Sequence, residues 1–142
     1  MKREYPERPL VGVGAVIVEG DRVVLVHRGA EPMAGEWSIP GGLLELGETM
    51  RAGAVREARE ETGLQVEAGE VLEVLDRIVP DAQGKIRYQY VLIDFLCRRI
   101  AGELRAGGDA AEARWVRESE LEGLGVAEAA VKVIRKGLAR PT

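Results

Sequence analysis

Three glutamates crowd one short stretch of the chain, the segment REAREETG at residues 56–63. The alanine-rich run before this segment and the glycine at its end predict a helix over residues 49–62, closed by a glycine that can adopt the left-handed conformation. On such a helix Glu57, Glu60 and Glu61 fall within roughly a 100° arc. The first question that the sequence raises is what this acidic face binds.

The acidic face has two interpretations, a solvated helix surface and a site for divalent cations. Like charges three and four residues apart repel by roughly 0.2–0.5 kcal/mol per pair, and the helix dipole disfavours negative charge in the last turns. Arg56 stands four residues before Glu60, where it can pair with that side chain, and Glu48 adds another carboxylate near the helix start. Cations held between the oxygens would relieve this repulsion, so we favour the metal site.

Composition limits which metal such a site would take. The 142 residues include one cysteine, Cys97, and one histidine, His27, which excludes a disulfide within the chain and a zinc site of the Cys/His kind. A metal must then be held by oxygen atoms, which points to Mg²⁺ or Mn²⁺. The formal net charge of −4 argues against a protein that coats nucleic acid.

Length and hydropathy predict one domain over residues 1–142, with residues 1–9 as a loose, polar N-terminal segment. No apolar run has the length of a signal peptide or of a membrane span. We therefore expect a cytoplasmic protein without membrane contact.

Segments rich in β-branched residues lie on both sides of the acidic stretch. We expect strands at 11–18, 23–27, 71–79, 85–97 and 112–116, a loop at 29–42, and a C-terminal helix at 126–138. Met50, Ala54 and Ala58 form an apolar stripe beside the glutamates, which predicts that the acidic helix packs on a sheet. Gly12 and Gly14, in GVGAVIV, lack the third glycine of a dinucleotide-binding fingerprint and are assigned to a strand. This order of elements indicates a mixed α/β domain.

Residues 42–64, GLLELGETMRAGAVREAREETGL, resemble the signature of the Nudix hydrolase superfamily. The matching positions are Gly42, Glu48, Arg56, Glu57, Glu60, Glu61, Gly63 and Leu64. Ala58 occupies the apolar slot, and the preceding WSIPGG is also typical of the family. The resemblance implies an α/β/α sandwich with a mixed β-sheet, in which the signature folds as loop–helix–loop. It also implies a divalent-metal hydrolase of nucleoside diphosphates linked to another group.

The resemblance also implies a role for each acidic residue of the signature. The implied ligands of Mg²⁺ are the carboxylates of Glu57, Glu61 and Glu60 and the backbone carbonyl of Gly41. Glu48 is implied as an auxiliary carboxylate, and Arg56 as the residue that orients the glutamates. Glu57 is our candidate for the general base, or for the ligand that positions it.

Some members of the family recruit a carboxylate from outside the signature. Asp109 and Glu112 are the candidates here, for this role or for contact with the substrate. The alternative is that they are ordinary polar residues of a loop and a strand.

Gly53 lies inside the expected helix, one turn before Glu57, although glycine there costs about 1 kcal/mol relative to alanine. We hypothesise that the loop at residues 40–47 packs against Gly53 and brings the carbonyl of Gly41 to the metal.

The signature does not identify the group attached to the diphosphate. Pro80 stands sixteen residues after Leu64, a spacing that the family associates with ADP-ribose pyrophosphatases; the alternative is an ordinary turn proline. ADP-ribose, cleaved to AMP and ribose 5-phosphate, is the favoured substrate. The alternatives are a nucleoside triphosphate pyrophosphohydrolase and a nucleotide-sensing module that has lost catalysis. Because family members that act on ADP-ribose are often dimers, a homodimer is expected by analogy.

Further candidates for substrate binding lie near the ends of the expected strands. Arg28 and Arg77 are placed to meet phosphates, with an ordinary exposed position as the alternative for each. Tyr88 and Tyr90 share one face of their strand, where they are expected to line a groove or a subunit contact.

Overall fold

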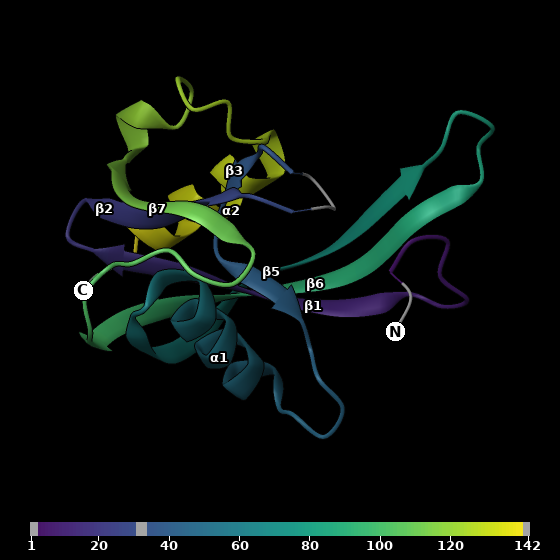
Figure 1. The fold of residues 1–142 in the computed structure, drawn as a ribbon. Coiled ribbons are helices and arrows are strands. Elements are labelled where there is room, and N and C mark those ends of the chain that lie inside the picture. Colours follow the sequence, from purple (N-terminus) through teal and green to yellow (C-terminus); the bar gives the residue numbers. More distant parts are fainter. Residues whose placement is uncertain (1–2, 31–33, 141–142) are drawn as a thin grey trace.

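A seven-stranded mixed sheet forms the centre of the molecule (Figure 1), in a computed structural model that describes residues 3–30 and 34–140. Its strands are β1 (Leu10–Glu19), β2 (Arg22–Arg28), β3 (Trp37–Ser38), β4 (Gly41–Leu43), β5 (Gln65–Pro80), β6 (Ile86–Ala101) and β7 (Ala110–Arg117). The helices are α1 (Met50–Thr62), the short 3₁₀ helix η1 (Glu118–Glu120) and α2 (Glu128–Leu138).

The strand β1 changes its neighbours along its length. One edge of β1 runs parallel to β6 over residues 10–17. On the other edge, Gly12 and Gly14 pair with β4, whereas Val18 and Glu19 pair with β2. The sheet order is β3-β2-β1-β6-β5, with β4 added to β1 and β7 added to β2.

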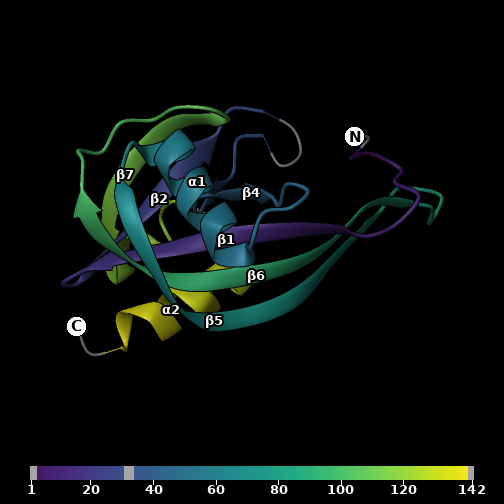
Figure 2. The same cartoon turned by 90° about the horizontal axis from the view of Figure 1, so that it is seen from below.

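The two long helices lie on opposite faces of β1 and β6, which Figure 2 shows from below. The core beneath α1 contains Val13, Ala15, Ile17, Ala54, Ala58 and Phe95. The core beneath α2 contains Val16, Leu25, Leu72, Val133 and Ile134. Successive residues of β1 enter different cores because side chains alternate across a strand. The α/β/α sandwich expected from the sequence is confirmed.

Two local expectations were wrong. The segment expected as loop contains β3 and β4, which form because each pairs with a longer strand, β2 or β1; residues 31–33 of that segment lie outside the described residues. Met50 was expected in the apolar stripe, but 44% of its surface is exposed. It is the first residue of α1, at the end of the helix where it does not face the sheet core.

The N-terminal segment, expected to be loose, has contacts with the hairpin of β5 and β6 from Glu4 onward, where Nε of Arg87 donates to Glu4 over 2.7 Å. The backbone N–H of Tyr5 donates to the carbonyl of Arg87 over 2.7 Å. The Tyr5 hydroxyl donates to Asp81 in the hairpin turn over 2.9 Å. Residues 1 and 2 of that segment lie outside the described residues.

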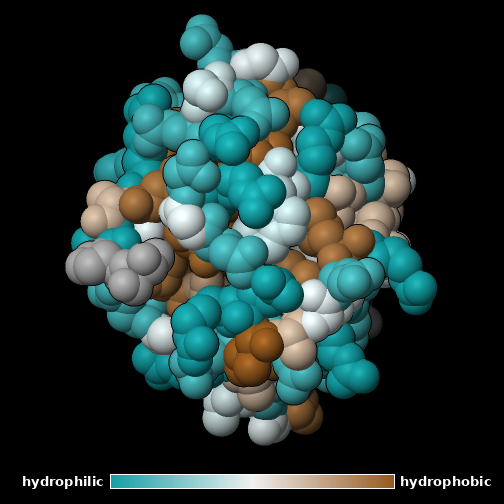
Figure 3. Space-filling view, turned by 90° about the vertical axis from the view of Figure 1, so that its left-hand side faces the viewer, coloured by the Kyte–Doolittle hydropathy of each residue, from teal (hydrophilic) through white to brown (hydrophobic). Residues whose placement is uncertain are grey.

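The face at the left of Figure 1 is mainly hydrophilic, with apolar residues in separate small patches (Figure 3). Scattered apolar surface of this kind is ordinary for a folded protein. In the parts of the chain that the structure describes, no helix has the length and apolar character needed to cross a membrane.

Candidate active site

The helix α1 is bounded by the residues that the sequence indicated. Thr49 caps its first turn by accepting a hydrogen bond from the N–H of Ala52 over 3.1 Å. Gly63 closes it in the left-handed conformation, with φ of 72°. The buried face of α1 carries small residues and one carboxyl group, Glu61, which is only 3% exposed. A carboxyl group at such a position requires a partner or a function.

Arg56 holds several of the acidic side chains at once. Its Nε donates to Glu48 over 2.7 Å, and its Nη1 donates to Glu57 over 2.9 Å and to Glu60 over 3.2 Å. Its Nη2 donates to the carbonyl of Leu43 in β4 over 3.0 Å. The hydrogen bond from Arg56 lowers the pKa of Glu48. The predicted pairing of Arg56 with Glu60 is confirmed. The guanidinium also connects α1 to β4, the strand that precedes it in the sequence.

Glu57 and Glu61 lie against the backbone of β4. The N–H of Gly41 donates to Oε1 of Glu61 over 2.9 Å. A Cβ atom on Gly42 would lie 2.5 Å from Oε1 of Glu57, so only glycine leaves room for that carboxyl group. Burial raises the pKa of Glu61 to about 7 and also raises the pKa of Glu57.

Asp109 lies in a loop that packs against the end of α1. The N–H of Gly107 donates to the carbonyl of Glu61 over 3.2 Å, and the carbonyl of Asp109 accepts from the N–H of Gly29 over 2.9 Å. The charge of Asp109 contributes to the raised pKa of both Glu57 and Glu61, after burial. The structure thus brings Asp109 close to the glutamates of the signature.

The donor atoms of this site are of the type that binds a divalent cation, but the side chains are not already arranged around one cation position. Within residues 3–30 and 34–140, no three acidic, histidine or cysteine side chains converge at cation-binding spacing. Glu48, Glu57 and Glu60 instead accept hydrogen bonds from Arg56. Glu57 and Glu61 nevertheless present two desolvated carboxyl groups side by side, a set of hard oxygen donors suited to Mg²⁺ or Mn²⁺. The side chain of Glu60 is 52% exposed and has room to turn.

Two predicted substrate-binding residues have other protein side chains as their observed partners. Glu112 is exposed on β7 and pairs with the guanidinium of Arg114 over 2.9 Å. Tyr88 is 8% exposed and packs in a small apolar cluster with Leu10 and Tyr90. Strand pairing, which the local sequence does not reveal, decides where these side chains point. A role of Glu112 or Tyr88 in substrate binding stays a prediction.

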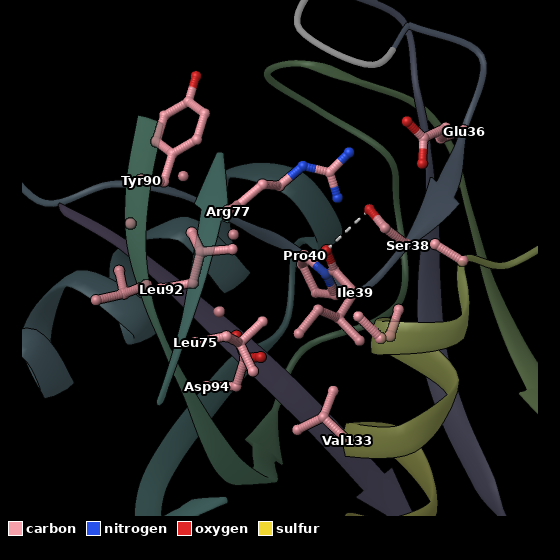
Figure 4. Close-up of a pocket in the computed structure, with 18 of the residues that line it drawn as sticks. Glu36, Ser38, Ile39, Pro40, Leu75, Arg77, Tyr90, Leu92, Asp94 and Val133 are labelled. Carbon is pink, nitrogen blue, oxygen red and sulfur yellow. Dashed lines mark hydrogen bonds between the residues drawn. The ribbon is translucent and has the colours of Figure 1, made fainter. Parts of the chain in front are cut away.

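Arg28 and Arg77 do line a pocket beside β4, as Figure 4 shows for Arg77. Sequence reasoning missed most of the other walls of this pocket, among them Ile39, Leu75 and Val133. These side chains come from a loop, from β5 and from α2, so no short segment of sequence contains their pattern. The feature of the sequence that could have indicated this pocket is the pair of glycines in β1, which also line it.

Comparisons with known proteins agree with this geometry. A family model described as the NUDIX domain matches residues 8–138. An ADP-ribose pyrophosphatase from Methanocaldococcus jannaschii is 36% identical over 107 residues, which are 75% of this chain and 61% of that protein. This chain therefore spans about three fifths of that relative's length.

Two further proteins are similar to this chain. A Mycobacterium tuberculosis protein named "Putative 8-oxo-dGTP diphosphatase 2" is 36% identical over 110 residues, covering 77% of this chain and 74% of that protein. The crystal structure of a MutT NUDIX hydrolase from Burkholderia pseudomallei has a TM-score of 0.75 at 28% identity, covering 92% of this chain and 98% of that one.

Proposed function

This chain belongs to the Nudix family, and on that premise we propose that it is a Mg²⁺-dependent pyrophosphohydrolase that also accepts Mn²⁺. Its substrate is a nucleoside diphosphate linked to another group, with ADP-ribose favoured, and the products are then AMP and ribose 5-phosphate. The observation that carries the proposal is the pair Glu57 and Glu61, whose carboxyl groups lie against the backbone of Gly41 and Gly42.

Nudix hydrolases generally use divalent metals, and the donors of this site are the oxygen atoms that such ions prefer. Glu57 and Glu61 would be the principal ligands, with Glu60 and the carbonyl of Gly41 as further ligands. When bound, the ion neutralises phosphate oxygens and lowers the pKa of a coordinated water.

The residues of the chain supply orientation and proton transfer. Arg56 fixes the direction of the Glu57 and Glu48 carboxylates through bonds of 2.9 and 2.7 Å. Glu57 acts as the general base that accepts a proton from the attacking water. Asp109, whose charge contributes to the raised pKa of Glu57, is our candidate for the carboxylate from outside the signature.

Two observations support ADP-ribose. The Methanocaldococcus jannaschii relative is named as an ADP-ribose pyrophosphatase. Pro80 ends β5 at the hairpin turn, at the family spacing noted above, although an ordinary turn proline would occupy the same place. The mycobacterial relative, named for a nucleoside triphosphate and equally similar in identity, favours the second candidate, a pyrophosphohydrolase of triphosphates.

Product analysis tests the proposal. The protein is incubated with ADP-ribose, nucleotide sugars, dinucleotides and nucleoside triphosphates, each with Mg²⁺, with Mn²⁺ or with chelator. We expect AMP and ribose 5-phosphate from ADP-ribose, and no products with chelator. Pyrophosphate from a triphosphate, with ADP-ribose untouched, would establish the second candidate, and no turnover across the panel would favour the nucleotide-sensing module.

Glu57→Gln tests the role of the acidic pair. Loss of the charge and of the proton acceptor should reduce turnover by at least about 100-fold, while the melting temperature changes by only a few degrees because burial already disfavours the ionised form. Glu67→Gln, at an exposed glutamate of β5, is the matched control and should retain full activity. Normal turnover by Glu57→Gln would contradict the proposed role.

A further inference from the structure

A pocket on the α2 side of the sheet lies directly behind β4. It has a volume of about 170 Å³ and lies between β1, β6 and β5 on one side and α2 with residues 38–40 on the other. An apolar cavity of about 150 Å³ is large enough to take up a benzene ring. The pocket is therefore large enough to receive a flat aromatic ring.

Two glycines of β1 create the floor of this pocket. A Cβ atom on Gly14 would overlap the carboxylate of Asp94, and a Cβ atom on Gly12 would lie 2.7 Å from the side chain of Leu92. The sequence GVGAVIV thus has a role beyond forming a strand. Its two glycines leave open the space that side chains would otherwise fill.

Asp94 lies at the deep end of the pocket, close to Leu75 and Val133, whereas Arg77 and Tyr90 lie toward the other end (Figure 4). It is 7% exposed, yet within the described parts of the chain no hydrogen-bond donor reaches its carboxylate. Burial raises its pKa to about 6, with a further contribution from the charge of Glu73. A buried carboxyl group that serves only the fold is normally hydrogen-bonded or paired.

Two other polar groups beside the pocket also lack partners. Within the described residues, Nε of Arg77 and the hydroxyl of Tyr90 are buried without a hydrogen bond. Both residues line the pocket, as Asp94 does. Unpaired polar groups of this kind are characteristic of a surface that completes its hydrogen bonds with a ligand.

The pocket and the acidic face of α1 share the backbone of β4. Gly41 and Gly42 line the pocket, and they also contact Glu61 and Glu57. A substrate whose diphosphate lies at these glutamates can therefore extend its attached nucleoside into the pocket.

We infer that this pocket receives the nucleobase and that Asp94 is a specificity-determining residue, which accepts a hydrogen bond from an amino group on the edge of a purine. The inference rests on the proposed function, because it assumes that the ligand is a nucleotide. The ring packs among Leu75, Leu92 and Val133, and its amino group meets the one carboxylate at the deep end. A site that hydrogen-bonds a ligand N–H rejects an analogue without it far more strongly than an apolar wall can.

Calorimetric binding of mononucleotides, without any metal, tests the inference. The two probes are AMP and purine riboside 5′-monophosphate, which is AMP without its 6-amino group. We expect the unmodified protein to bind AMP at least about tenfold more tightly than the analogue. Asp94→Leu, of similar size but without an acceptor, should reduce this ratio to about one to two.

Two further variants separate hydrogen bonding from shape and from general effects on the fold. Asp94→Asn keeps an acceptor oxygen and should keep the preference for AMP. Asp76→Leu, at an exposed aspartate of β5, is the matched control and should bind both nucleotides as the unmodified protein does.

The outcomes distinguish this inference from the proposed function. A ratio near one in the unmodified protein, an unchanged ratio in Asp94→Leu, or no binding of AMP at millimolar concentration would overturn the inference about Asp94. Hydrolysis of ADP-ribose could still be intact in each of those cases. Conversely, a protein without turnover that shows the expected ratios would overturn the hydrolase proposal and retain the role of Asp94.

Discussion

At the scale of single residues, Arg56 organises the acidic site. Its planar guanidinium reaches Glu48, Glu57 and Glu60 and also the backbone of β4. Only a group with several donors in a rigid fork can satisfy acceptors in these directions together. The position of the glutamates therefore depends on the geometry of Arg56 as well as on its charge.

Arg56→Lys keeps the positive charge but replaces the fork by a single ammonium group. We expect turnover to fall by about 10–100-fold, with more Mg²⁺ needed for half-maximal activity, because residues that orient metal ligands typically have effects of this size. Metal titrations of the initial rate provide the measurement. Arg59→Lys, at an exposed arginine of the same helix, is the control. Equal metal requirements in the two variants would show that Arg56 contributes only charge.

At the scale of elements, α1 and the loop before it fit together at Gly53. A Cβ atom there would lie 2.9 Å from Cδ1 of Leu44, 3.0 Å from Oε1 of Glu48 and 3.2 Å from Val13. The loop therefore packs on the helix at this glycine, as hypothesised from the sequence. Whether this contact also brings the Gly41 carbonyl to a metal stays a prediction.

Gly53→Leu should displace the loop and, with it, Glu48 and the strand β4. We expect turnover to fall about 100-fold, since a displacement near 1 Å in an active site can have that effect. Overpacking should cost about 1–3 kcal/mol of stability, partly offset by about 1 kcal/mol of helix propensity, so the melting temperature should fall by only several degrees.

Initial rates and thermal unfolding, measured on the same preparations, check this expectation for Gly53→Leu. Ala52→Leu, one residue earlier and exposed, controls for a larger side chain on α1. Full activity in Gly53→Leu would rule out a functional role for this close approach.

At the scale of the whole molecule, the fold tolerates a buried carboxyl group in the centre of its sheet. Asp94 lies on β6 beside Gly14 of β1, with a folded-state pKa of about 6 against 3.8 for an unperturbed aspartate. Because the folded value is the higher one, Asp94 supports stability below about pH 4, and this contribution is lost as the pH rises through 6. Above that pH the ionised group destabilises the fold by about 3 kcal/mol.

Asp94→Asn removes this titration and should change the pH dependence of stability. The free energy of unfolding of the variant, relative to the unmodified protein, should increase by about 2–3 kcal/mol between pH 4 and pH 8. Urea unfolding at both pH values measures this difference. Asp76→Asn controls for the loss of one negative charge on the same sheet. A difference that does not change with pH would mean that Asp94 is already neutralised by a partner in the fold.

Sequence alone identified the features that depend on neighbouring residues. The helix 49–62, its closing glycine, the arc of Glu57, Glu60 and Glu61 and the pairing of Arg56 with Glu60 all follow from helical periodicity over a few turns. The signature lies within 23 consecutive residues, so it can be recognised without knowledge of the fold.

The tertiary structure decided what depends on residues far apart in the chain. The pairing of β1 with β6 joins Gly14 to Asp94, and the loop before β7 packs on the end of α1, so that the charge of Asp109 acts on Glu61. The short strands β3 and β4 exist only because longer strands accept their hydrogen bonds. Local periodicity predicts the face of the strand on which a side chain lies, but it does not predict which strand is the neighbour. The pocket and its buried carboxyl group therefore form only when the strands pair in the complete sheet.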